Sequence, residues 1–113
     1  MAPLGSSGYI DVRDVGRVHA WVAEHKVDGK RFLMAAGRGI PQANVDILRR
    51  KYPERRHIIQ EGKPGEGYDT EGYGWPEGMA RFVCDEAREI LGGKFIGLEE
   101  SIVDTAKVLE RYL

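Results

Sequence analysis

The hydrophobic pattern is clearest in the first third of the chain, where a predicted strand leads into a helix. The β-rich tetrad Tyr9–Val12 predicts the strand, and Asp14 suits the N-cap of the helix that follows it. Valines at helical spacing predict that this helix runs from about Val15 to His25. The segment Arg31–Ala36 is continuously apolar at its centre, which predicts a second strand buried on both faces.

The middle of the chain predicts a second helix with short irregular or extended segments on either side. Pro41 suits the first turn of this helix because its missing N–H would be unpaired there in any residue. Pro53 ends the helix after about Tyr52. We expect Gly37–Gly39 to form a loop before the helix, and His57–Ile59 predicts a short third strand after it.

The last third of the chain predicts a short strand and two helices. Ala80–Val83 predicts the strand, and Asp85 is expected to cap a helix over Glu86–Leu91. A final helix runs from about Glu99 to Tyr112, with acidic residues at its start as the helix dipole favours. Its apolar stripe consists of Leu98, Ile102, Val103, Ala106, Leu109 and Leu113. The fold class is therefore predicted to be α/β, as a small mixed domain of three to four helices with short strands.

Length and composition narrow the class of protein. The 113 residues suffice for one domain and are too few for two; we expect residues 1–8 to be a flexible lead-in and residues 9–113 to form the domain. The formal net charge of −1 provides no basic field that would attract nucleic acid. No apolar run approaches the roughly 20 residues of a membrane span. The single Cys84 excludes an internal disulfide and fits a reducing compartment, so we expect a cytoplasmic location.

Two acidic residues flank an arginine near the first predicted helix. Asp11 and Asp14 around Arg13 are typical either of an acid–base pair or ion site, or of a helix cap beside an ion pair. The second interpretation is favoured because Asp14 stands at the predicted start of the helix. His19, on the same helix, is expected to be half-buried and hydrogen-bonded rather than to face a substrate.

The remaining polar clusters give little indication of chemistry. The three histidines and Cys84 show no spacing typical of a metal site, so no metal is predicted. The basic residues of Arg49–Lys51 and Arg55–His57 could bind phosphate. A solvated helix end that complements the helix dipole explains them better.

The segment Glu61–Gly78, called here the glycine-rich loop, differs from the rest of the chain. It combines six glycines and two prolines with aromatic residues. Loops longer than about 12–15 residues are uncommon and are usually functional or disordered. Its tyrosines and tryptophan offer flat amphipathic surface, and its glycines permit motion. Its part Tyr68–Gly78 is the best candidate for a binding surface, and simple loop packing or disorder is the alternative.

Six segments of the chain, taken together and in order, resemble a known enzyme family. They are Gly8–His19, Gly29–Gly37, Asp46–Pro53, Gly62–Gly67, Asp85–Gly92 and Leu98–Thr105. The first contains the D-V-R-D-V motif of extended short-chain dehydrogenase/reductases, and the set resembles ketone and aldehyde reductases of the dihydroflavonol-reductase and methylglyoxal-reductase type. Gly16 stands where that family usually has alanine.

The resemblance implies that the chain is the substrate-side C-terminal part of such an enzyme, without the full Rossmann domain. In relatives the cofactor fold and the catalytic serine, tyrosine and lysine lie upstream of the position matched by Tyr9. No Tyr-x-x-x-Lys motif occurs in this chain, so no catalytic residue is predicted in it and no cofactor is expected to bind to it alone. The intact enzyme is expected to use NADP(H) to reduce a small ketone or aldehyde.

The resemblance also implies a partner and a site. The partner is the N-terminal Rossmann domain of the same enzyme, and the candidate substrate-binding residues are Tyr68, Tyr73, Trp75 and Met79. The alternative function is a stand-alone binding or interaction module derived from such a domain, without enzymatic activity. Because strands that normally complete a larger sheet would leave an open edge, we also predict self-association.

Overall fold

The computed structural model describes residues 7–75 and 82–112. Within these residues the chain forms four α-helices, two short strands and two short 3₁₀ helices. The elements are β1 (Ser7–Tyr9), α1 (Val12–Glu24), β2 (Gly37–Gly39), α2 (Pro41–Lys51), η1 (Pro53–Arg55), α3 (Asp85–Ile90), α4 (Leu98–Leu109) and η2 (Glu110–Tyr112). This confirms the predicted small mixed α/β fold.

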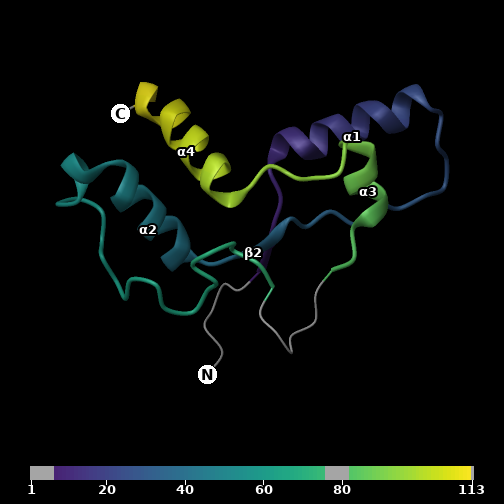
Figure 1. Ribbon diagram of the computed structural model, residues 1–113. Helices are drawn as coiled ribbons and strands as arrows, with labels where there is room; N and C mark the ends of the chain where they lie inside the picture. The colour runs from purple at the N-terminus through teal and green to yellow at the C-terminus, as the bar shows by residue number, and fades with distance from the viewer. Residues whose placement is uncertain (1–6, 76–81, 113) are drawn as a thin grey trace.

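The elements gather into two lobes (Figure 1). The α2–α4 lobe contains α2, α4 and the described part of the glycine-rich loop, and the α1–α3 lobe contains α1, α3 and the extended segment 30–36. The Cα radius of gyration is 16.1 Å and the principal extents are 50 × 39 × 22 Å. A compact domain of about 100 residues has a radius of gyration of about 13 Å. The chain is therefore more open than a self-contained domain of its size.

The α2–α4 lobe has its own apolar core. Ala43 and Ile47 of α2 are completely buried, because residues four apart share the helix face that meets α4. They pack with Ile40 and with Leu98, which opens α4. The partly buried side chains around this core are Tyr9, Tyr68, Tyr73, Ile102 and Val103.

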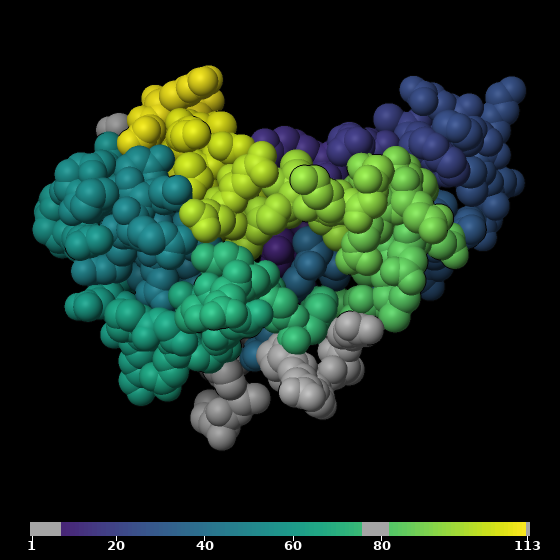
Figure 2. Space-filling model, viewed as in Figure 1, coloured from purple at the N-terminus to yellow at the C-terminus, as the bar shows by residue number. Residues whose placement is uncertain are grey.

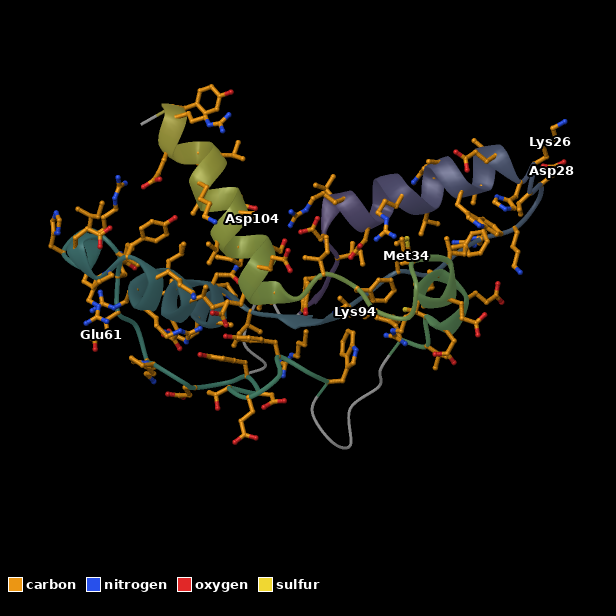
Figure 3. All side chains as sticks on the ribbon, turned by 45° about the horizontal axis from the view of Figure 1, so that its top comes forward. Lys26, Asp28, Met34, Glu61, Lys94 and Asp104 are labelled. Atoms are coloured by element: carbon orange, nitrogen blue, oxygen red, sulfur yellow. The ribbon has the colours of Figure 1, made fainter. Side chains whose placement is uncertain are left out.

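The α1–α3 lobe has a smaller core. Val18 of α1 packs with Ala87 and Leu91 at α3. The extended segment contributes alternate side chains, as the two-residue period of an extended backbone requires. Phe32 and Met34 pack against this core, and Figure 3 shows Met34 beside α3. Leu33, between them, is 52% exposed.

A two-stranded antiparallel ribbon lies between the lobes. In this ribbon Tyr9 of β1 is opposite Gly37 of β2. A Cβ at Gly37 would lie 2.5 Å from the backbone oxygen of Tyr73, so the position requires glycine unless the backbone moves. The neighbouring Arg38 N–H donates to the same oxygen at 3.3 Å. The ribbon thereby fixes the glycine-rich loop at Tyr73.

The start of α1 differs from the prediction. The helix begins three residues earlier, and its N-cap is Asp11 rather than Asp14. The Asp11 side chain accepts the backbone N–H of Arg13 at 2.8 Å. The strand accordingly occupies Ser7–Tyr9 instead of Tyr9–Val12. Aspartate suits an N-cap at either position, and the cap bond to the second residue of the helix decides between them.

Three other segments also differ from the prediction. Gly37–Gly39, expected to be a loop, forms β2. Arg31–Ala36, expected to be a strand, is extended but belongs to no sheet within residues 7–75 and 82–112. His57–Ile59, expected to be a strand, forms a turn, because the side chain of Arg49 donates to two carbonyl oxygens there.

The C-terminal predictions agree more closely with the structure. The last helix is confirmed as α4 continued by η2. The short helix before it is also present, but the predicted cap was wrong, because Asp85 is its first residue and Cys84 is its N-cap. The predicted strand Ala80–Val83 lies partly outside the described residues, and its last two residues belong to no strand. Residues 1–6 also lie outside the described residues. The first strand, β1, begins at Ser7, inside the predicted lead-in of residues 1–8. The division of the chain into a lead-in and a domain at residue 9 stays a prediction.

Candidate functional site

The glycine-rich loop is fastened to α2 by two polar side chains, Gln42 and Asp46. Gln42 donates to the backbone oxygen of Glu61 at 2.9 Å and accepts the backbone N–H of Lys63 at 2.9 Å. Asp46 accepts the backbone N–H of Gly65 at 2.8 Å and the side-chain amide of Gln42 at 2.7 Å. Because the two side chains lie one helical turn apart, they face the loop together.

Tyr68 completes this hydrogen-bonded arrangement. Its hydroxyl donates to the Asp46 carboxylate at 2.6 Å. Burial and this hydrogen bond raise the pKa of Tyr68 to about 12. Burial alone would raise the pKa of Asp46, but hydrogen bonds from Tyr68, Gly65 and Gln42 outweigh it and lower that pKa below 3.8. Since the Tyr68 hydroxyl donates its proton to Asp46, it is not available as a donor to a ligand.

Tyr68 and Tyr73 form an aromatic pair on the α2–α4 lobe. Their rings stack with centroids 5.8 Å apart and an interplanar angle of 6°. Both side chains are half-buried against the core of the lobe. Arg50 lies 3.4 Å from the Tyr73 hydroxyl and 3.1 Å from the carboxylate of Glu99. The structure thus brings Tyr68 and Tyr73, two of the four predicted residues, into contact. Their packing on the core of the lobe also agrees in part with the alternative of simple loop packing.

Trp75 belongs to a separate aromatic cluster at the ribbon. Its ring meets that of Phe82 edge to face, with centroids 5.3 Å apart and planes at 87°. A Cβ at Gly8 would lie 3.2 Å from both Ala35 and Trp75, so the indole rests directly on β1. Phe82 remains 49% exposed. Met79 lies outside the described residues, and a substrate-binding role for the four predicted residues stays a prediction.

Arg13 joins the two lobes at the start of α1. Its guanidinium pairs with Asp11 at 2.8 Å and with Asp104 of α4 at 2.9 Å. Figure 3 shows Asp104 on α4, across from α1. The hydrogen bond from Arg13 holds the pKa of Asp11 well below its ordinary 3.8, although burial opposes this. Asp14, buried in the first turn of α1, instead accepts the backbone N–H of Ile96 at 2.7 Å. The interpretation as a helix cap beside an ion pair is confirmed, but the cap is Asp11 and not the predicted Asp14.

The surface is indented between α4 and α1, as Figure 2 shows. A cavity of about 390 Å³ lies there, lined by residues 10–13 and by residues of α4. The ion pair of Arg13 with Asp104 supplies its polar part, and the exposed side chains of Val12 and Val108 supply an apolar rim. A second open cavity of about 500 Å³ lies between α1 and α3, where Lys30 pairs with Glu86 at 2.6 Å. The predicted aromatic residues line neither cavity.

The basic cluster around the end of α2 is used within the fold. Arg50 and Lys51 pair with Glu99 of α4 at 3.1 and 3.3 Å. Arg55 of η1 pairs with Glu110 of η2 at 3.2 Å. These contacts link the C-terminal end of α2 to both ends of α4. They favour a structural role for the cluster over a phosphate site.

The other candidate ligands are also accounted for. His19 is exposed rather than half-buried, and its Nδ1 lies 2.8 Å from the backbone oxygen of Val15. Cys84 is a buried free thiol. In the part of the chain that the structure describes, no three His, Cys, Asp or Glu side chains gather as a metal site. None of the described helices has the length and apolar character that a membrane span requires.

Comparison with known proteins decides the family. No family model matches the chain. Over 93% of its length, however, the chain is 36% identical to the NADPH-dependent methylglyoxal reductase GRE2 of Saccharomyces cerevisiae. Over 86% of its length it is 30% identical to the putative NADPH-dependent methylglyoxal reductase GRP2 of Candida albicans.

The chain matches the C-terminal portion of an extended short-chain dehydrogenase/reductase. The crystal structure of yeast methylglyoxal/isovaleraldehyde reductase Gre2 complexed with NADPH superimposes on it with a TM-score of 0.73 and 32% identity. That match covers 93% of this chain and 33% of the reductase. The chain spans 30% and 27% of the lengths of the two curated reductases. The family predicted from the six sequence segments is thereby confirmed.

Two residues that organise the candidate site were not assigned a role from the sequence. Gln42 and Asp46 lie on α2, and the loop that they bind begins about ten residues after α2 ends. A signal was present in the sequence, because the amide of Gln42, which can donate and accept, and the carboxylate of Asp46, which can accept, stand four residues apart on a helix. The loop's run of glycines supplies unshielded backbone N–H groups for them. Nothing in that pattern states that the two would meet.

Proposed function

We propose that this chain is the substrate-side part of an NADPH-dependent reductase that transfers hydride to a small ketone or aldehyde. The observation that carries the proposal is the match of 93% of the chain to 30% of a methylglyoxal reductase. The chain is proposed to be non-catalytic alone, since it contains no Tyr-x-x-x-Lys motif. NADP(H) would be bound by the intact enzyme.

The extended segment supports docking against the N-terminal Rossmann domain of the same enzyme. Within residues 7–75 and 82–112, Arg31–Ala35 makes no backbone hydrogen bond, whereas Ala36 N–H donates to Tyr9 at 2.7 Å. The side chain of Leu33 is 52% exposed on the side away from the lobe core. Unpaired backbone groups beside an apolar side chain are typical of a strand edge that another sheet covers. A sheet in the upstream domain would cover both.

The glycine-rich loop is proposed to form part of the substrate pocket wall. The residues are Tyr68, Tyr73 and Trp75 of the loop, and Met79, which follows it in the sequence. The stacked tyrosines and the edge-to-face contact of Trp75 with Phe82 support this, because they form rigid aromatic surface on the loop. Such surface suits a small carbonyl compound with an apolar body.

The open edge also supports self-association of the chain when the upstream domain is absent. An extended backbone with free donors and acceptors can pair with the same segment of a second copy. Pairing of copies and docking of the upstream domain would use the same groups. The two are therefore proposed to exclude each other.

The experiment that tests the proposed function is the isolation of the native gene product with an antibody against this chain. We expect a species much larger than 12.7 kDa that oxidises NADPH when methylglyoxal is added. The isolated chain is expected to show no such activity. A native product of 12.7 kDa without reductase activity would contradict the proposal and favour a stand-alone binding module.

A further inference from the structure

We infer that Gln42 and Asp46 are positioning residues that fix the described part of the glycine-rich loop, residues 61–75, and with it the rings of Tyr68, Tyr73 and Trp75, before any substrate arrives. The inference rests on the proposed function for the role of the wall. Its physical basis, the attachment of the loop to α2, stands on this chain alone. Neither residue is proposed to touch substrate or cofactor.

Gln42 forms hydrogen bonds with the two residues that flank Gly62 at the beginning of the loop. Its amide nitrogen binds the oxygen of Glu61, and its amide oxygen binds the N–H of Lys63, each at 2.9 Å. Gly62, between them, has a φ of 61°, and a Cβ there would collide with the Gln42 amide oxygen. The turn therefore closes tightly on this side chain, and only glycine leaves room for it.

Asp46 holds the next part of the loop with a charged acceptor. One carboxylate oxygen accepts from Gln42, and the other accepts from the Gly65 N–H and the Tyr68 hydroxyl. Hydrogen bonds to an ionised acceptor are roughly twice as strong as neutral ones. Asp46 therefore fixes the backbone at Gly65 and the orientation of the Tyr68 ring through one side chain.

The later part of the described loop, at Tyr73, is held by the ribbon. The Tyr73 N–H donates to Asp69 at 2.9 Å, and the Tyr73 oxygen accepts from Arg38 of β2 at 3.3 Å. Stacking of Tyr73 on Tyr68 joins this part to the part that Asp46 holds. Trp75 follows two residues later, so its position depends on both attachments. The described part of the loop is thus organised in advance, which lowers the entropy lost when a ligand binds.

The first test uses the isolated chain with Asp46→Asn and the control Glu54→Gln. Both remove one negative charge, and Glu54 is exposed on η1. In Asp46→Asn we expect the amide signals of Lys63 and Gly65 to exchange faster, and the pKa of Tyr68 to fall from about 12 toward 10.0. NMR of the amides and of labelled tyrosine rings measures both, and Glu54→Gln is expected to change neither.

The second test uses the intact reductase that contains this chain. Asp46→Asn and Tyr68→Phe are each expected to raise KM for methylglyoxal about tenfold, the effect of losing one charge-assisted hydrogen bond. We expect kcat and KM for NADPH to stay within about twofold, because the loop acts on the carbonyl substrate alone. The double variant is expected to raise KM by less than the product of the two single effects, since the two residues share one hydrogen bond.

The outcomes separate the inference from the proposed function. Unchanged loop amides and an unchanged Tyr68 pKa in Asp46→Asn overturn the inference, whatever the enzyme does. Faster exchange in the loop together with an unchanged KM for methylglyoxal supports the attachment and overturns the substrate wall. Faster exchange with the expected rise in KM supports both.

Discussion

The two lobes contain similar elements but are built to different degrees of completeness. In the α2–α4 lobe, two long helices share a closed core, and Arg50, Lys51 and Glu99 join them by ion pairs. The glycine-rich loop covers one side of this core with two stacked tyrosines. In the α1–α3 lobe, α1 meets only the short α3 and an extended segment that belongs to no described sheet.

The difference supports the proposed docking of the α1–α3 lobe on an upstream domain. The α2–α4 lobe has a closed apolar core made by its own elements, although Ile58, Val108 and Leu109 are exposed on its surface. The α1–α3 lobe leaves Leu33 at 52%, Val83 at 68% and Val12 at 80% exposed. Apolar residues exposed singly are common, but Leu33 and Val83 line one cavity together with extended backbone that has no hydrogen-bond partners in the described part of the chain. The incomplete lobe is therefore the one that would contact the rest of a reductase.

The largest effect on stability is expected from Ile47→Ala. Ile47 is completely buried at the centre of the α2–α4 core, and its loss leaves a cavity there. We expect the free energy of unfolding to fall by about 3–5 kcal/mol. The matched change Leu91→Ala, in the smaller core, is expected to cost about 2–3 kcal/mol. Urea unfolding measures both, and a larger loss at Leu91 would reverse the ranking of the lobes.

The next effect is expected from Gly37→Ala, where the loop meets the ribbon. The added Cβ would lie 2.5 Å from the Tyr73 oxygen, so strand or loop must move. We expect a loss of about 1–3 kcal/mol. The control is Gly16→Ala on α1, where a Cβ meets nothing within 4 Å, and it is expected to stabilise by about 1 kcal/mol. Thermal unfolding is therefore expected to show a lower midpoint for Gly37→Ala and a higher midpoint for Gly16→Ala than for the parent chain. A midpoint for Gly37→Ala at or above that of the parent would contradict the close contact.

Asp11→Ala tests the N-cap of α1 and the position of Arg13, which joins the lobes. Loss of the N-cap and of the pair with Arg13 is expected to cost about 1–2 kcal/mol at neutral pH. Because folding lowers the pKa of Asp11, its contribution is complete above its ordinary pKa of 3.8 and is lost as pH falls below that value. Urea midpoints of variant and parent are therefore expected to converge in acid. The control Asp104→Ala, at an exposed partner, is expected to cost less than about 1 kcal/mol.

Leu33→Asp is expected to leave the stability of the isolated chain almost unchanged. An exposed position away from the core alters the free energy of unfolding by no more than about 0.5 kcal/mol. The same charge would prevent a second sheet from covering the segment, so we expect self-association to disappear in sedimentation measurements. The control is Ile58→Asp, at another exposed apolar residue, in the turn after η1. Equal loss of association in both variants would contradict the assignment of the edge.

The elements that could be predicted from the sequence are those whose local signals agree with their packing. Proline at both ends and a periodic apolar face identified α2, and the apolar stripe of α4 identified the last helix. The strand predicted at Arg31–Ala36 was wrong because the described residues supply no neighbouring strand with which its apolar run could pair. The loop predicted at Gly37–Gly39 was wrong because Gly37 is required by its close contact with Tyr73 and not by a turn. Such a long-range contact cannot be predicted from local turn preferences.

The candidate site was predictable only in part for the same reason. Composition singled out the glycine-rich loop and its aromatic residues. The attachment of the loop depends on Gln42 and Asp46, which lie 19 residues or more from the loop atoms that they bind. The cap was placed at Asp14 rather than Asp11 because both residues carry the same side chain. The hydrogen bond from the Arg13 N–H to Asp11 and the bond from the Ile96 N–H to Asp14 separate their roles.

Backbone hydrogen exchange at Arg31–Ala35 tests the central claim most directly. The claim is that this chain is the C-terminal part of a reductase whose incomplete lobe docks on an upstream domain. We predict fast exchange of these amides in the dilute isolated chain, at rates near those of an unstructured peptide, and strong protection in the intact enzyme. Fast exchange in the intact enzyme, or protection in the isolated chain equal to that of α2, would contradict the claim.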